Sequence, residues 1–196
     1  LSVYLYGKER NTVVVSVPIA SHTDREKELL KSRLERSWYI KVNGVGKSFV
    51  IEEILVAPET VTAFWNERPS GKVRWVDWGS RTIGYGTTVN NFGNMRFLDV
   101  ESGTLDKSGL DAKNVDDSEV EFLVDFVAGN LLSKWDKGDT VINIGGGVLR
   151  PGLLGYMRRY FENSETVSNP QTYLVGGMFE LGKEVVGYGS WERSFR

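Results

Sequence analysis

The sequence predicts an α/β protein of two lobes, each with a mixed sheet flanked by helices. Runs of β-branched and aromatic residues, typical of strands, alternate with runs whose apolar residues recur at helical spacing. A polar stretch at residues 66–72 separates a first part of the chain from a second part with a different order of elements. A chain of 196 residues, 40% of them apolar, is long enough to form two small lobes that share a cleft.

Residues 1–70 are expected to form two pairs of strands with a helix between them. A polar connection at residues 7–11 predicts a hairpin between the first two strands, and a glycine-rich turn at 43–46 predicts one between the next two. Thr23 or Asp24 is suited to cap the helix. The expected elements are strands at 1–6, 12–19, 38–42 and 47–57, a helix reaching Arg36, and a short helical turn at 59–65.

Residues 71–196 are expected to form the other lobe. Three successive strands make a meander, and Ser118 with Glu121 forms an S-x-x-E capping box ahead of a strongly apolar helix. Pro151 and Pro170 suit the first turns of two later helices, because proline has no N–H to leave unpaired there. The expected elements are strands at 73–78, 82–89, 95–101 and 140–144, and helices from Ser118 to about Trp135, near Pro151, and from Asn169 onward; the tail 187–196 is left unassigned. The order βββ, α, β, α, α is that of the ribonuclease-H-like, or actin-like, half-fold.

Composition narrows the function classes. The chain has no cysteine, which excludes disulfides and thiolate metal sites and fits the cytoplasm. No apolar stretch approaches the length that crosses a bilayer, so no membrane partner is expected. The formal net charge of −2 argues against direct, salt-driven binding to nucleic acid. His22 is the only histidine, which disfavours multi-histidine metal sites, and we expect it in a solvent-facing loop before the helix.

An acidic residue stands at the end of the buried-looking strand in "VRWVDWGSRTIGYGTT". The turn after Asp77 exposes the backbone N–H groups of Gly79, Ser80, Arg81 and Thr82, and such a turn suits phosphate oxygens. Asp77 at its edge would hold a hydrated Mg²⁺ against those phosphates, because Mg²⁺ prefers one or two carboxylates with water and phosphate. The alternative is an aspartate that caps its own turn, a common use of Asp before Gly.

A second strand ends in three glycines, Gly145, Gly146 and Gly147. Glycines at this position let a flat ligand or a phosphate approach the backbone closely, although they also permit tight packing alone. Two glycine-bearing strand exits in one half-fold favour a nucleotide lying between them.

Glu59 follows Pro58 at the end of a strand in "VAPETVTAF". A carboxylate that faces a γ-phosphate can orient the attacking water, but a glutamate in the first turn of a helix also suits the helix dipole without any further role. "NGVGKSF" is not a phosphate-binding P-loop, because position 41 is lysine where the P-loop requires its first glycine; a hairpin turn is expected there.

These motifs together resemble a known family. "VSVPIA", "ILVAPETVTAFW", "VDWGSRT", "ESGTL", "INIGGGV" and "SNPQTYLVGGMFELG" follow one another as in the plasmid-segregation actin-like ATPases of the ParM and AlfA type. The resemblance implies ATP or ADP with Mg²⁺ as cofactors, Asp77 on the metal's shell, the 79–82 backbone on the β- and γ-phosphates, Gly145–Gly147 beside the nucleoside, and Glu59 on the water. It also implies a homopolymeric filament that engages plasmid DNA through an adaptor protein.

Three features depart from the family pattern. The family's first phosphate loop is not found before Val13, so we expect N-terminal residues to be missing. Trp78 and Arg81 are bulkier than the residues common in the second phosphate loop. The interval between "ESGTL" and "INIGGG" leaves room for one helix but not for a complete outer subdomain on the second lobe, which resembles AlfA more than ParM.

Three other functions stay open. A ribonuclease-H-like nuclease shares the order of elements but needs several carboxylates around two metals, and no acid ends the strand at 140–144. A sugar or acetate kinase would need an acceptor pocket and an acidic base, which no segment clearly supplies. A non-hydrolysing scaffold would keep the fold alone.

Overall fold

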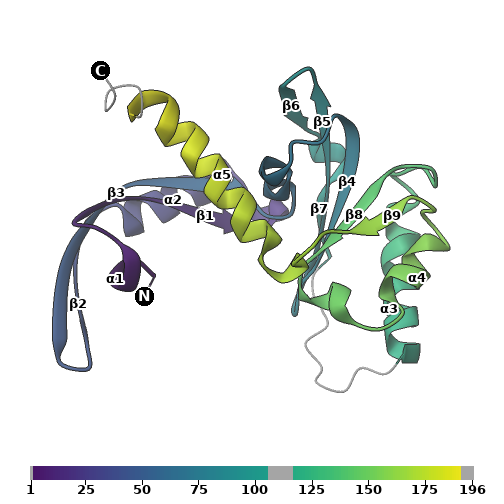
Figure 1. Ribbon diagram of the computed structural model, residues 1–196, viewed down its shortest axis with the longest axis horizontal. Coiled ribbons are helices and arrows are strands. Elements are labelled where there is room, and N and C mark those ends of the chain that lie inside the picture. The colour runs from purple at the N-terminus through teal and green to yellow at the C-terminus, as the bar shows by residue number, and fades with distance from the viewer. Residues whose placement is uncertain (1, 106–116, 191–196) are drawn as a thin grey trace.

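Two separate sheets organise the chain into two lobes in the computed structural model, which describes residues 2–105 and 117–190 (Figure 1). The first sheet has the strand order β1-β3-β2. The second sheet has the order β6-β5-β4-β8-β9, with β7 paired to β5 outside this path. The mixed α/β character and the two-lobe arrangement predicted from the sequence are therefore confirmed.

The first lobe is built on a long strand, β3 (Val45–Pro58). On one side β3 pairs in parallel with β1 (Arg10–Val17), and on the other it forms an antiparallel hairpin with β2 (Ser37–Val42). Helix α2 (Asp24–Leu34) packs against β3. It begins as predicted, since the Thr23 side chain accepts a hydrogen bond from the backbone N–H of Glu26 at 3.3 Å.

The strand predicted at residues 1–6 is wrong. Residues Ser2–Tyr6 form a short helix, α1, and the N–H of Gly7 donates to the Val3 carbonyl at 2.9 Å. β1 takes β3 as its partner over its whole length, so no hairpin forms between β1 and the segment before it. β-prone side chains do not make a strand without a neighbouring strand to pair with.

The second lobe contains the predicted meander. Its first two strands, β4 (Gly71–Trp78) and β5 (Ile83–Asn91), match their predicted ranges within two residues. The segment predicted as one strand at 95–101 forms a strand only as far as Phe97 and then a 3₁₀ turn. The strand β9 was not predicted, because its three residues, Ser-Glu-Thr, carry little apolar pattern. The remaining elements here are β6 (Asn94–Phe97), the 3₁₀ turn η3 (Asp99–Glu101), β7 (Gly103–Leu105), β8 (Val141–Ile144) and β9 (Ser164–Thr166).

The helices of this lobe correct two details. Ser118 lies inside α3 (Asp117–Leu131), so it is not the residue that caps this helix, and α3 ends four residues before Trp135. The last helix, α5 (Pro170–Ser190), runs into the tail that had no assignment. The other helical segments are the 3₁₀ turns η1 (Ile19–Ser21), η2 (Val61–Asn66) and η4 (Gly146–Leu149), and the helix α4 (Leu153–Arg158).

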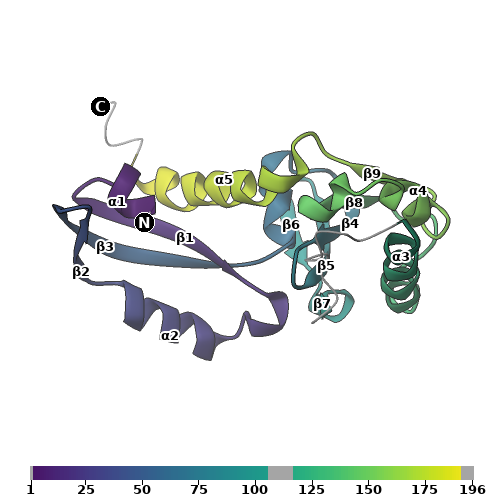
Figure 2. The same ribbon diagram turned by 90° about the horizontal axis from the view of Figure 1, so that it is seen from below.

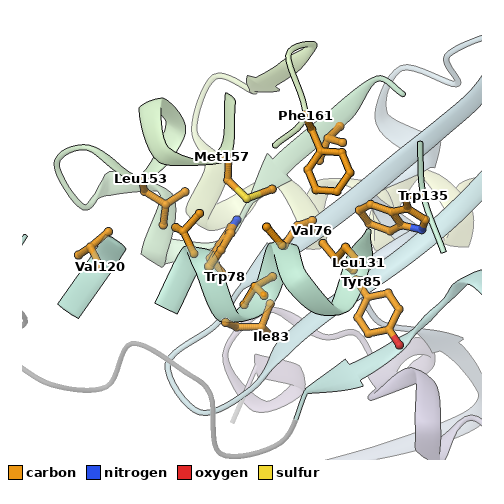
Figure 3. Close-up of a cluster of buried hydrophobic side chains, with 14 residues drawn as sticks. Val76, Trp78, Ile83, Tyr85, Val120, Leu131, Trp135, Leu153, Met157 and Phe161 are labelled. Carbon is orange, nitrogen blue, oxygen red and sulfur yellow. The ribbon is translucent and has the colours of Figure 1, made fainter. Parts of the chain in front are cut away.

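Alternate residues of β4 face two different cores. Val76 and Trp78 point into a cluster closed by α3 and α4, with Leu131, Leu153 and other apolar residues (Figure 3). On the opposite face, Trp75 packs with residues of η2 and α5. This alternation places Asp77 on the η2 side of the sheet, because side chains of neighbouring strand residues point to opposite faces.

The chain connects the lobes at two places. It leaves β3 and continues directly into η2, which already packs on the second sheet. It returns through α5, which contacts η2 and β8 near its start and β1 further on (Figure 2). The predicted boundary between residues 70 and 71 stays a prediction. Within the described residues, none of the helices combines the length and the apolarity needed to cross a membrane.

Candidate functional site

Asp77 lies at the centre of the site predicted from the sequence. It is the penultimate residue of β4, opposite Gly84 of β5 on one side and beside Ile144 of β8 on the other. Burial, followed by the charge of the nearby Glu59 carboxylate, raises the pKa of Asp77 to about 6. In the part of the chain that the structure describes, the Asp77 side chain has no hydrogen-bond or ion-pair partner. A half-buried carboxylate without a protein partner is suited to a ligand that carries positive charge.

Gly145 closes one side of this carboxylate. It follows β8 directly and has a φ of 88°, a conformation that favours glycine. A Cβ at this position would overlap Oδ1 of Asp77 and would lie 2.8 Å from the Trp78 carbonyl oxygen. Asp77 and the glycine exit, which the sequence suggested only as neighbours across a sheet, are therefore in direct contact.

The loop after Asp77 is tight. A Cβ on Gly79 would lie 2.6 Å from the carbonyl oxygen of Thr82, so this loop requires glycine there. The N–H of Gly79 donates to the Asp77 carbonyl at 3.1 Å, which removes one of the four predicted phosphate donors. Within the described residues, the N–H groups of Ser80, Arg81 and Thr82 have no backbone acceptor, so they are free to bind a ligand.

The bulk of Trp78 and Arg81 does not fill the loop. Trp78 is fully buried on the opposite face of the sheet, within the hydrophobic cluster drawn in Figure 3. Its Nε1–H donates to Oδ1 of Asn143 at 2.9 Å. Arg81 is exposed to solvent. The hydrogen bond to Asn143 holds the ends of β4 and β8 together, a role for Asn143 that the sequence did not indicate.

Glu59 comes close to Asp77 from the first lobe. It follows the last residue of β3, and its backbone N–H donates to the Val17 carbonyl at 2.8 Å. Burial raises the pKa of Glu59, which is half-buried. The two carboxylates interact electrostatically, because the charge of Glu59 contributes to the raised pKa of Asp77. The predicted helix start at Glu59 is shifted, because η2 begins at Val61.

The other two glycines of the triplet meet the start of α5. Gly146 is exposed, and a Cβ there would come no closer than 3.8 Å to the Gln171 side chain. The N–H of Gly145 donates to the Pro170 carbonyl at 2.9 Å. Gly147 is buried in η4. Only the fold brings Gln171, at the start of α5, to the end of β8, so the sequence did not indicate that these residues are neighbours.

A magnesium nucleotide fits the residues that are present. An unpartnered carboxylate, free N–H groups and a backbone kept open by glycine are the features that metal-bound phosphates require. His22 is not in this site: it is half-buried, with Nε2 3.2 Å from the Val56 carbonyl oxygen. Within the described residues, no group of three or more histidines and carboxylates is placed to hold a metal by itself.

Comparison with known proteins shows a shared fold at low sequence identity. No family model matches the chain, and no curated protein matches it. Solved structures match closely: an AlfA filament bound to AMPPNP has a TM-score of 0.71 and 16% identity, over 95% of this chain and 65% of that one. A 15-stranded ParM filament from Clostridium botulinum has a TM-score of 0.67 and 16% identity, over 87% of this chain and 66% of that one.

An archaeal actin homologue in complex with ADP gives a TM-score of 0.73 and 16% identity, over 93% of this chain and 75% of that one. The structural neighbours are thus ParM- and AlfA-type filament proteins and an archaeal actin homologue, and the predicted actin-like fold is confirmed. The chain spans 65% of the length of the AlfA chain. The structural similarity establishes the fold, whereas sequence identities of 16% do not establish the activity.

Proposed function

We propose that the chain acts as an actin-like ATPase that binds ATP or ADP with Mg²⁺ between its lobes, polymerises into filaments and hydrolyses the nucleotide within them. The observation that carries this proposal is the Asp77 carboxylate, which is half-buried without a protein partner, against Gly145 and beside the free N–H groups of Ser80, Arg81 and Thr82. Structural neighbours of the same fold bind AMPPNP and ADP.

The mechanism is positioning and charge stabilisation. Mg²⁺ would neutralise charge on the phosphates and be held through water by Asp77. Ser80, Arg81 and Thr82 donate their backbone N–H groups to phosphate oxygens as charge develops. The backbone of Gly145, Gly146 and Gly147 lies against the nucleoside. Glu59 accepts a hydrogen bond from the attacking water and orients it in line with the leaving phosphate.

The proposed partners are based on the structural neighbours that were solved as filaments. The chain polymerises with copies of itself, in the cytoplasm, and moves plasmid copies apart. Its formal charge of −2 fits contact with DNA through an adaptor protein rather than directly.

Light scattering with phosphate release tests the proposal in the full-length protein. Mg-ATP and, separately, Mg-ADP are added while right-angle scattering and free phosphate are followed together. We expect scattering to rise with Mg-ATP and phosphate release to follow. EDTA in place of Mg²⁺ serves as the control and should abolish both signals.

The alternatives give different traces. Steady phosphate release with flat scattering would favour a hydrolase, and turnover that requires an added sugar or acetate would favour a kinase of the same fold. Scattering without phosphate release would favour a non-hydrolysing scaffold. No rise in scattering together with no phosphate release would contradict the proposal.

A further inference from the structure

The backbone between Glu59 and Val61 makes a turn of high energy. Thr60 has φ 66° and ψ −64°, and the N–H of Val61 donates to the Glu59 carbonyl at 2.7 Å. This is a γ-turn with positive φ, a form that is rare and strained. Positive φ is particularly unfavourable for a β-branched residue such as threonine.

The side chain of Thr60 is also in an unfavourable state. The residue is fully buried, and its Oγ1 has no hydrogen-bond partner among the described residues. A buried hydroxyl without a partner lowers stability relative to an apolar group of the same shape. Neither the backbone conformation nor the hydroxyl of Thr60 stabilises the fold, so stability does not account for a threonine at this position.

Both lobes hold the strained turn in place. On the side of the first lobe, the N–H of Glu59 donates to the Val17 carbonyl of β1 at 2.8 Å. On the side of the second lobe, the Thr60 side chain fills the space that a Cβ on Gly84 would occupy. Gly84 is the residue of β5 that pairs with Asp77. Strain of this kind persists only where the surrounding structure imposes it, and it concentrates at functional sites.

We infer that Thr60 is a positioning residue whose side chain, wedged against Gly84, fixes the γ-turn and so holds the Glu59 carboxylate at the Asp77 site. The inference rests on the proposed function, in which Glu59 orients the attacking water. The shape of the side chain is what acts, because its hydroxyl contacts no acceptor.

Two substitutions separate shape from hydroxyl. Thr60→Val keeps the branched shape and removes the hydroxyl, whereas Thr60→Gly removes the wedge and frees the backbone. We expect Thr60→Gly to lower kcat at least tenfold while the Kd for ATP stays within twofold, since a misplacement of about 1 Å can cost on the order of a hundredfold in rate. Thr60→Val should keep kcat within about threefold of the wild-type value.

Thermal unfolding excludes a merely structural role. Glycine adopts positive φ without strain, so the Tm of Thr60→Gly should equal or exceed that of the wild type while its turnover falls. If the side chain only supported the fold, Tm, ATP affinity and turnover would fall together, and the inference would be overturned. It would also be overturned if Thr60→Gly hydrolysed ATP at the wild-type rate, or if Thr60→Val lost turnover as Thr60→Gly does.

Amide exchange distinguishes a failure of this inference from a failure of the proposed function. If the wild type shows no hydrolysis, the proposed function fails, and the position of the turn is read from hydrogen exchange of the Val61 amide by NMR. Protection of that amide in the wild type and in Thr60→Val, with faster exchange in Thr60→Gly, supports the wedge. Equal exchange in all three proteins overturns it.

Discussion

The backbone of Gly145 lies directly against the carboxylate of Asp77, so closely that a Cβ on Gly145 would overlap Oδ1. Gly145→Ala should therefore displace the carboxylate, and its φ of 88° adds strain for any residue with a side chain. We expect the Kd for Mg-ATP to rise at least tenfold, measured by isothermal titration calorimetry.

Gly129→Ala is the matched control for that substitution. Gly129 lies in α3, where a Cβ would meet nothing within 4 Å, so alanine should bind nucleotide as the wild type does and should raise stability slightly. Wild-type affinity in Gly145→Ala would show that the contact with Asp77 does not shape the nucleotide site.

Glu59→Gln should separate binding from hydrolysis. Glutamine keeps the size of the side chain but is a much weaker acceptor for the attacking water, so phosphate release should fall on the order of a hundredfold with the Kd for ATP nearly unchanged. Filaments should still form, as seen by light scattering. Glu53→Gln is the control, because Glu53 lies on β3, the strand that leads to Glu59, and is exposed. Unchanged turnover in Glu59→Gln would remove Glu59 from the mechanism.

The raised pKa of Asp77 predicts a specific pH dependence of stability without nucleotide and metal. Burial and Glu59 raise this pKa from 3.8 to about 6, so the folded state binds a proton more tightly than the unfolded state does. Ionisation of the Asp77 carboxyl therefore lowers the free energy of unfolding as pH rises from about 4 through 6. A rise of about two pKa units corresponds to about 3 kcal/mol in the free energy of unfolding.

Asp77→Asn removes this titration. Urea unfolding at a series of pH values should show the variant close to the wild type near pH 4 and more stable by about 2–3 kcal/mol at pH 8. Titrating groups that do not interact with Asp77 cancel in the difference between the two proteins. A difference that does not change with pH would contradict the environment described for Asp77.

Arg74 is the buried cation of the second lobe. It is 1% exposed, its Nε donates to Oδ2 of Asp139 at 2.7 Å, and its guanidinium also bonds Glu101 and lies 5.3 Å from the Trp135 ring centre. Arg74→Met would remove the cation that Glu101 and Asp139 share, and would leave Asp139 with Lys72 at 3.7 Å as its remaining ion-pair partner. We expect a loss of about 3 kcal/mol in the free energy of unfolding, measured with urea.

Arg10→Met is the control for Arg74. Arg10 pairs with Glu52 on the surface of the first lobe, where the two side chains are 70% and 40% exposed. Exposed ion pairs contribute little, so this substitution should leave the unfolding midpoint nearly unchanged. If the two variants lost the same stability, the buried network would have no special role.

Local patterns predicted the second lobe well. The strands around Asp77 and before Gly145 alternate or concentrate apolar residues and end at glycine, and both features depend on neighbours in the sequence. The first residues were predicted wrongly for the same reason. Residues 2–6 have side chains that suit a strand, yet β1 pairs with β3, which lies more than thirty residues further along the chain.

The sequence by itself determined the α/β class, the meander, the glycine exits and the acid at the end of β4, because each of these depends on residues that are adjacent in the sequence. Only the tertiary structure decided that Gly145 meets Asp77, that Glu59 approaches from the other lobe, and that Thr60 is held in a strained turn against Gly84. These relationships depend on which strands pair and on how the lobes pack, and both are set by contacts between residues distant in the chain.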